Sequence, residues 1–385
     1  MKLMLCRRYA LWLWPAMLLL LSLLLPAAAA AESELATEEG GITARAAILM
    51  DRETGRVLWE KNAQLRLPMA STTKIMTAIL ALELGNEADV ITTSKRAAAT
   101  EGSSIWLEEG EQKTLEELLY GLMLLSGNDA AVAIAEHIAG SVENFAALMN
   151  EKAAAIGATN THFCNPHGLP DDRHYTTAYD LALISAYALQ NERFREIIRT
   201  PEYIISWPGR EWDRVLQNQN RLLELYPGGD GVKTGWTKEA GRCFVGSATR
   251  EGWQLVAVVL NAPQMWEDTM RLLDYGFETY SRQKVLYQGQ VICTAEVYKG
   301  TQRVDVVASK DFHYPLRPEE RSRVRYVIKL QDRLAAPLAA GQKLGELEMY
   351  LGENLLGRVE LQSGQAIRRM PLGHYLAGLW KSFLR

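Results

Sequence analysis

The chain has 385 residues, of which 48% are hydrophobic and 23% charged, and its formal net charge is −4. A chain of this length and composition can bury a substantial core and form two domains, which argues against a disordered or fibrous protein. No segment is strongly basic, so nucleic acid is not an expected partner.

The first 31 residues have the three-part layout of an export signal, with basic residues, an apolar run from about Tyr9 to Leu25 and an alanine-rich stretch. We expect a signal peptide at 1–31 and a mature protein that is secreted or held at the outer face of the cytoplasmic membrane. Cleavage would remove three positive charges and take the net charge from −4 to −7, with the loss of Lys2, Arg7 and Arg8. An uncleaved membrane anchor is the alternative, because the apolar run approaches the length of a membrane span.

Residues 32–281 are predicted to form an α+β domain. The pattern at 46–59 predicts a β-hairpin, and strand character returns after the turn at 227–230. Between them, and once after the last strand, apolar spacing predicts helices at 71–84, 115–125, 130–139, 142–156, 178–189 and 267–280. Because strands at both ends enclose a helical middle, we expect the N- and C-terminal strands to share one antiparallel sheet.

The remaining chain predicts two further parts. Short β-prone stretches separated by glycine, proline and charged turns indicate a small all-β domain at 282–366. Residues 367–385 combine apolar residues at helical spacing with basic residues, which is typical of an amphipathic helix that binds a membrane surface weakly and reversibly. A terminal helix packed on its own domain is the alternative.

Three cysteines follow the predicted signal peptide, Cys164, Cys243 and Cys293. Their odd number and wide spacing favour free or buried thiols over a disulfide framework, although the sequence leaves one pair open.

The first chemical motif is Ser71-Thr72-Thr73-Lys74, where a helix is expected to begin. Ser71 and Lys74 then lie one turn apart on the same face, so the lysine can accept the serine proton. To act as a base the lysine must be neutral part of the time, and burial or nearby positive charge would lower its pKa. Taken alone, Ser71 is an ordinary helix N-cap, and Ser281 to Lys284 repeats the spacing with nothing to suggest catalysis.

The second and third motifs are also weak alone. Ser126-Gly127-Asn128 stands between two predicted helices, where a hydroxyl can relay a proton and a carboxamide can hold an amide, but a capping turn would look the same. Lys233-Thr234-Gly235 lies by a predicted strand. Its cation and hydroxyl suit a carboxylate, and its glycine permits close approach of a ligand.

Together and in this order, the three motifs are the signature of penicillin-binding proteins and class A β-lactamases. The chain resembles the low-molecular-mass penicillin-binding proteins that act as serine D-alanyl-D-alanine carboxypeptidases. The likeness covers residues 40–280 strongly and is carried by the stretches 44–78, 124–140, 162–184 and 230–252. It implies a penicillin-recognition α+β domain, a β-rich domain and a C-terminal amphipathic helix.

The resemblance also implies roles for the motif residues. Ser71 would be the nucleophile that forms an acyl-enzyme with the peptidoglycan stem peptide, Lys74 its base, and Ser126 the group that protonates the departing D-alanine. Asn128 would hold the peptide amide. Lys233, Thr234 and Gly235 would form the carboxylate site, and the backbone N–H groups of Ser71 and Trp236 the oxyanion hole. The resemblance implies no metal or organic cofactor, and it implies covalent inhibition by β-lactams.

The central motif has glycine where class A β-lactamases have aspartate, and no glutamate occurs between Glu151 and Glu192 to activate a deacylating water. We therefore expect slow release of bound β-lactams. Trp236 and Arg242 could also contribute side chains to the pocket, or simply pack and face solvent.

Other readings of the sequence are a zinc peptidase, a nucleophile-elbow hydrolase and a non-catalytic peptidoglycan-binding module. His162, Cys164, His167 and His174 cluster in one stretch, but their spacing matches no zinc motif and no His-Glu-x-x-His occurs. A Gly-x-Ser-x-Gly elbow is also absent from the sequence. The presence of both Ser71 and Lys74 argues against the non-catalytic reading. The sequence leaves open a D,D-endopeptidase, the stem-peptide preference, a vegetative or sporulation role, and the oligomeric state.

Overall fold

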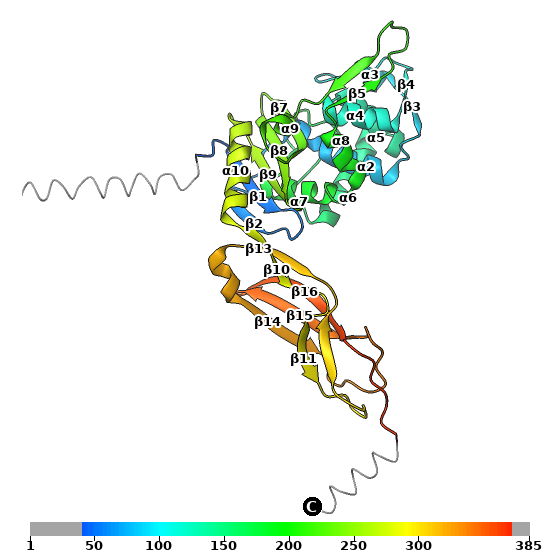
Figure 1. Cartoon of the computed structure of the whole chain (residues 1–385). Helices are drawn as coiled ribbons and strands as arrows, with labels where there is room; N and C mark the ends of the chain where they lie inside the picture. The colour runs from blue at the N-terminus through cyan, green and yellow to red at the C-terminus, as the bar shows by residue number, and fades with distance from the viewer. Residues whose placement is uncertain (1–40, 372–385) are drawn as a thin grey trace, which may run out of the picture.

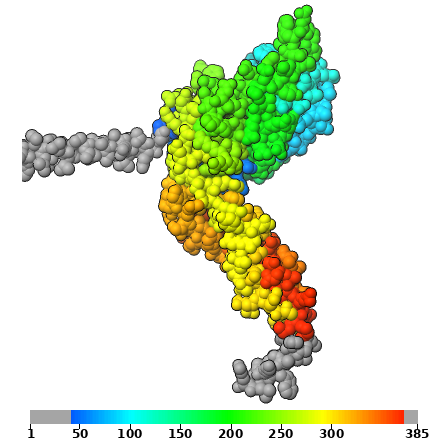
Figure 2. Space-filling model, in the orientation of Figure 1, coloured from blue at the N-terminus to red at the C-terminus, as the bar shows by residue number. Residues whose placement is uncertain are grey.

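A computed structural model describes residues 41–371. The predicted signal peptide and most of the predicted terminal helix lie outside the described residues. Figure 1 shows a larger domain of mixed helix and sheet followed by an elongated domain of strands, and Figure 2 shows the second domain extending from the first as a narrower body. The predicted α+β fold with a β-rich second domain is confirmed. Between residues 41 and 371, no helix has the length and apolar character needed to cross a bilayer.

A five-stranded antiparallel sheet in the order β2-β1-β9-β8-β7 forms the centre of the first domain. Its strands are β1 (Ala46–Asp51), β2 (Val57–Lys61), β7 (Gly229–Thr237), β8 (Gly241–Arg250) and β9 (Trp253–Leu260). The predicted pairing of N- and C-terminal strands is confirmed, since β1 pairs with β9 over six residues from Ala46–Leu260 to Asp51–Leu255. β7 is an edge strand of this sheet.

Both faces of the sheet are covered, so its central strands are buried on both sides. Along β9 the side chains alternate between two cores: Val256 and Val258 belong to the larger, helical core, whereas Ala257 and Val259 face the smaller one. α10 (Met265–Thr279) packs on the smaller-core side, and α7 (Ala178–Ala188) contacts β1 and β9 on the other. This explains why β9 is continuously apolar from Leu255 to Leu260.

The predicted helices form with small shifts at their ends. They are α2 (Lys74–Leu84), α4 (Leu115–Leu124), α5 (Asn128–Ala139), α6 (Val142–Ile156), α7 and α10. Ser71 lies before α2, in a 3₁₀ turn (Ala70–Thr73), so the predicted helix start at residue 71 is three residues early. The sequence did not predict the short elements α3 (Lys95–Ala98), α8 (Glu192–Arg199), α9 (Leu222–Leu225), β3 (Val90–Thr92), β4 (Gln112–Thr114), β5 (Glu202–Ile205) and β6 (Arg214–Gln217).

The second domain begins directly after α10. Its five-stranded sheet has the order β11-β12-β16-β15-β14, beside a two-stranded ladder of β10 and β13. The strands are β10 (Ser281–Leu286), β11 (Val291–Ala295), β12 (Val304–Ala308), β13 (Phe312–Leu316), β14 (Val324–Leu330), β15 (Lys343–Leu351) and β16 (Asn354–Ser363), with a 3₁₀ turn at Pro318–Arg323. The second Ser-x-x-Lys sequence lies on β10, where Ser281 is exposed and Lys284 forms an ion pair with Asp311.

Buried side chains join the two domains. Arg56, which precedes β2, forms an ion pair with Glu320 at 2.7 Å, and both side chains are 14% exposed. The same guanidinium donates to the carbonyl of Pro315 and lies over the rings of Tyr280 and Tyr314. Cys164, Cys243 and Cys293 are all free.

Candidate active site

Ser71 and Lys74 meet at the end of α2 that faces the sheet. The Nζ of Lys74 lies 3.0 Å from the Oγ of Ser71, 2.7 Å from the Oδ1 of Asn128 and 2.8 Å from the carbonyl oxygen of His167. A neutral amine in this position would donate to the two carbonyl oxygens and accept the hydroxyl proton of Ser71. This is the geometry that a general base requires.

The surroundings of Lys74 favour the neutral amine, as predicted. The side chain is fully buried, and its pKa lies well below the ordinary value, chiefly because burial penalises the charge and secondly because Lys233 is close. The carboxylate of Asp129 opposes this shift.

Burial also lowers the pKa of Lys233, to about 7. Its Nζ donates to the carbonyl of Thr234 at 3.1 Å. A buried ammonium group on Lys233 would be stabilised by an anion, so a substrate carboxylate suits this position.

The backbone before Ser71 is held in an uncommon conformation, with Ala70 at φ 47°. The hydroxyl of Thr73 donates to the carbonyl of Ala70 at 2.7 Å and lies 2.8 Å from Nε2 of His174. Because Nδ1 of His174 accepts from the backbone N–H of Cys164 at 3.0 Å, Nε2 carries the proton and donates to Thr73. His174 is 4% exposed and burial lowers its pKa to about 4, so it is neutral near pH 7.

Gly168 belongs to the same contact. A Cβ on this glycine, whose φ is +91°, would lie 1.9 Å from the carbonyl oxygen of Ala70. Gly168 thus lets the loop of His167 press against the nucleophile turn. Sequence reasoning missed the roles of Thr73, His174 and Gly168, although the histidine stood in a cluster that drew attention to it as a metal ligand.

Ser126 lies between α4 and α5, as predicted, whereas Asn128 is the first residue of α5, two residues before the predicted helix start at 130. Ser126 has φ 63°, and its buried hydroxyl has no hydrogen-bond partner among the residues that the structure describes. Burying a hydroxyl without a partner costs about 1–3 kcal/mol of stability. A hydroxyl that forms its hydrogen bond only with a bound ligand would account for this cost. Asn128 accepts from Lys74 through Oδ1 and donates from Nδ2 to the carbonyl of Glu101 at 2.6 Å.

Strand β7 forms the opposite wall of the site and carries Lys233, Thr234, Gly235 and Trp236. A Cβ on Gly235 would lie 2.9 Å from the backbone nitrogen of Ser71, so only glycine permits this approach of strand and nucleophile. Two adjoining pockets of about 290 and 350 Å³ share Ser71, Ser103 and Trp236 in their walls. Trp236 is 67% exposed there. Sequence reasoning had no signal for Ser103, nor for Gln219, Met265 and Trp266, which line the first pocket.

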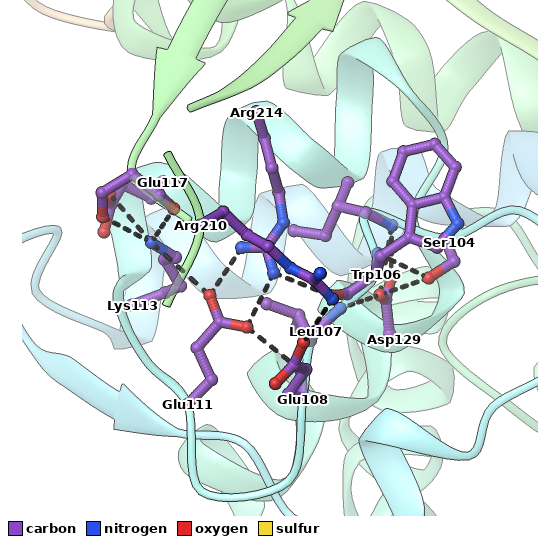
Figure 3. A network of polar contacts seen from close by, with 12 residues as sticks. Ser104, Trp106, Leu107, Glu108, Glu111, Lys113, Glu117, Asp129, Arg210 and Arg214 are labelled. Carbon is purple, nitrogen blue, oxygen red and sulfur yellow. Dashed lines mark hydrogen bonds and ion pairs between the residues drawn. The ribbon is translucent and has the colours of Figure 1, made fainter. Parts of the chain in front are cut away.

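The loop that carries Ser103 is held by Asp129, the residue after Asn128. Its carboxylate accepts from the backbone N–H groups of Ile105 at 3.1 Å and Leu107 at 3.0 Å, and from the hydroxyl of Ser104 at 2.6 Å (Figure 3). Asp129 is 1% exposed. One turn of α5 therefore fixes both Asn128 and the loop that walls the pocket.

Comparison with protein families finds two matches. The family model described as D-alanyl-D-alanine carboxypeptidase matches residues 32–264, and the model of the penicillin-binding protein 5 C-terminal domain matches residues 280–369. Among characterised proteins, the chain is 37% identical to the D-alanyl-D-alanine carboxypeptidase DacF of Bacillus subtilis, over 93% of this chain and 95% of that protein. It is 33% identical to DacA of Escherichia coli, over 86% and 82% of the two chains.

Solved structures give the same result. Penicillin binding protein 5 from Haemophilus influenzae aligns with a TM-score of 0.70 at 30% identity, covering 85% of this chain and 98% of that one. A peptidoglycan synthesis regulatory factor (PBP3) from Streptococcus pneumoniae aligns with a TM-score of 0.73 at 28% identity, covering 85% and 100%. The likeness thus extends over both domains.

Proposed function

The chain belongs to the D-alanyl-D-alanine carboxypeptidase family and is a serine-type enzyme of that family, and from this premise we propose how its residues cleave the substrate. The hydrogen bond between Ser71 and the buried Lys74 is the observation that carries the proposal. In it, Ser71 attacks the terminal D-Ala-D-Ala bond of a peptidoglycan stem peptide.

Acylation begins when neutral Lys74 accepts the Ser71 proton. The Oγ of Ser71 then bonds to the carbonyl carbon of the penultimate D-alanine, and the oxyanion is held by the backbone N–H groups of Ser71 and Trp236. As the C–N bond breaks, the proton that Lys74 took up passes through Ser126 to the departing amine, and Lys74 becomes neutral again. D-alanine leaves, and water hydrolyses the remaining ester on Ser71 to regenerate the serine.

Substrate binding is assigned to the groups around this bond. Lys233 and Thr234 bind the terminal carboxylate, which neutralises the buried ammonium group, and Gly235 keeps the strand close enough to reach it. The carboxamide of Asn128 lies at the pocket wall and holds the peptide amide, while its Oδ1 keeps Lys74 in place.

β-lactams carry a carboxylate and a reactive amide, so the same groups would bind them and Ser71 would be acylated. The ester is expected to persist, since the sequence offers no glutamate at 152–191 to activate a water.

The test uses the mature chain and a diacetyl-Lys-D-Ala-D-Ala peptide. The wild-type protein should release D-alanine in a reaction that penicillin blocks and EDTA spares. Ser71→Ala should abolish both release and covalent penicillin labelling, and the matched control Ser281→Ala should change neither. Labelling that survives in Ser71→Ala would remove this residue as the nucleophile. Penicillin labelling without D-alanine release would favour a D,D-endopeptidase, and neither reaction would favour a non-catalytic wall-binding module.

We also propose that residues 1–31 direct export, that the catalytic domain spans 32–281 and the β domain 282–366, and that residues 367–385 tether the enzyme to the outer face of the cytoplasmic membrane. The apolar and basic pattern at both ends of the sequence supports this. Deletion of 367–385 should release the mature protein from membranes, and continued retention would point to an uncleaved signal segment.

A further inference from the structure

Trp106 is an exposed tryptophan on a loop that is held by many contacts. It lies three residues after Ser103, a wall residue of both active-site pockets. Its indole is 59% exposed, whereas its neighbours Ile105 and Leu107 are buried. The loop thus anchors itself through two aliphatic side chains and presents the largest one to solvent.

The backbone of Trp106 is strained and clamped. Its φ of 59° is uncommon for a bulky residue and costs about 1–3 kcal/mol. Its N–H donates to the hydroxyl of Ser104 at 2.7 Å, and its carbonyl accepts from Arg214 at 2.7 Å. Strain of this size persists only where the surroundings enforce it, and it is concentrated at functional sites.

A buried ion-pair cluster holds Arg214, the residue that contacts the backbone of Trp106. Arg214 donates to both carboxylate oxygens of Glu111, and Lys113 lies 3.6 Å from Glu111 and 3.7 Å from Glu117. Arg214, Glu111 and Lys113 are each at most 9% exposed. Figure 3 shows the indole of Trp106 turned away from these ion pairs, so the cluster fixes the backbone without covering the ring.

A second tryptophan extends the surface. The rings of Trp106 and Trp207 stack with centroids 6.4 Å apart and an interplanar angle of 20°. Arg210 lies over Trp207 and 3.6 Å from Glu108, and both of these charged side chains are about half exposed or more. Arg214 also lies over Trp207, 4.4 Å from the ring centroid, so the exposed apolar area is chiefly the Trp106 indole, with Trp207 beside it and charged groups nearby.

We propose that the exposed indole of Trp106, supported by Trp207, is a binding surface for a sugar ring of the peptidoglycan glycan strand. This rests on the proposed function, which supplies a substrate whose peptide is attached to sugar. One face of a pyranose ring is lined by C–H groups and its edge by hydroxyl and amide groups, which matches an exposed indole with charged groups beside it. The stem peptide itself offers mainly small and charged side chains, which suit an exposed indole less well.

Trp106 lies close to the pocket wall at Ser103, because it is only three residues further along the chain. The Cα atoms of Ser103 and Trp106 can lie at most about 11 Å apart. The scissile bond and the sugar are separated by about four stem residues, which span about 14 Å when extended. A membrane surface is a poorer occupant, because the β5–β6 hairpin that carries Trp207 lies at the opposite end of the described structure from the far end of the β domain, after which the proposed membrane tether follows (Figure 1).

The experiment compares two substrates on one variant. Trp106→Asn removes the ring, and asparagine tolerates a positive φ, so the loop is kept. The kcat/KM for a disaccharide-linked pentapeptide should fall about tenfold, while that for diacetyl-Lys-D-Ala-D-Ala and the rate of penicillin acylation should stay within twofold of the wild type. Trp212→Ala is the matched control, since Trp212 is 62% exposed on the β5–β6 hairpin loop that also carries Trp207. Its kcat/KM should be unchanged for both substrates.

Binding of stem-free glycan strands, measured by titration calorimetry, tests the surface without turnover. The proposal predicts that the wild-type protein binds these strands and that Trp106→Asn weakens the binding about tenfold. This result would support the sugar-binding surface even if the protein released no D-alanine. Failure to release D-alanine would overturn only the proposed function. An equal loss of kcat/KM on both substrates would overturn the sugar-binding proposal and indicate that Trp106 shapes the pocket. Unchanged glycan binding and unchanged kinetics in Trp106→Asn would also overturn it.

Discussion

Lys233 should make the enzyme less stable than it would be without this charge. The side chain is buried and makes no ion pair within residues 41–371, and burial lowers its pKa to about 7 from the ordinary 10.5. The difference between these values is worth about 5 kcal/mol, at about 1.4 kcal/mol per pH unit. Replacing Lys233 with Met keeps most of the volume and removes the charge, so we expect Lys233→Met to be more stable and almost inactive.

The gain in free energy of unfolding of Lys233→Met should shrink as the pH rises. Below pH 7 the lysine is charged in both the folded and the unfolded chain, and the folded state carries the full cost. As the pH rises from 7 toward 10.5, the folded lysine is neutral while the unfolded one is still charged, so the cost fades. The variant should therefore exceed the wild type in free energy of unfolding by about 5 kcal/mol at pH 6 and about 2 kcal/mol at pH 9.

Urea denaturation at the two pH values measures this difference. Lys113→Met is the matched control, because Lys113 is equally buried but lies near Glu111 and Glu117, and its loss should destabilise the protein. A Lys233→Met protein no more stable than the wild type at pH 6, or a gain that does not shrink by pH 9, would refute the reasoning.

Two further predictions concern the base and the nucleophile turn. The rate of penicillin acylation should fall at low pH as Lys74 becomes protonated, and the midpoint of this fall should lie well below pH 10.5. Lys233→Met should move the midpoint to higher pH, because a charge that lowers the pKa of Lys74 is lost. An unmoved midpoint in stopped-flow acylation would contradict this. His174→Phe should slow acylation about fivefold, since one neutral hydrogen bond of about 1 kcal/mol is lost and Thr73 loses its donor. His174→Gln should recover most of the rate by donating to Thr73, and equal rates in both variants would argue against a positioning role.

The sequence predicted the parts of the fold that repeat a pattern over many residues. The helices α4 to α7 have 10 to 15 residues each and apolar spacing, and all were expected. The strands β3 and β4 have three residues each, and α8 has eight, too few for a period to stand out.

Some residues of the candidate site could be predicted from the sequence, and others could not. Motif residues such as Ser71 and Lys233 could be named from spacing, and the lowered pKa of Lys74 followed from burial. The roles of His174 and Trp106 could not, because they depend on contacts with residues far away in the chain, Thr73 and Arg214. A one-dimensional pattern carries no record of such contacts.

The pairing of β1 with β9 has a consequence for how the enzyme comes into being. About two hundred residues separate the two strands, so the central sheet has high contact order and its assembly is expected to be slow. A chain emerging from its N-terminus presents Ser71 and Lys74 long before β7 exists to complete the pocket. Reactivity toward D-alanyl peptides and β-lactams should therefore arise late and all at once, when the last strands close the domain.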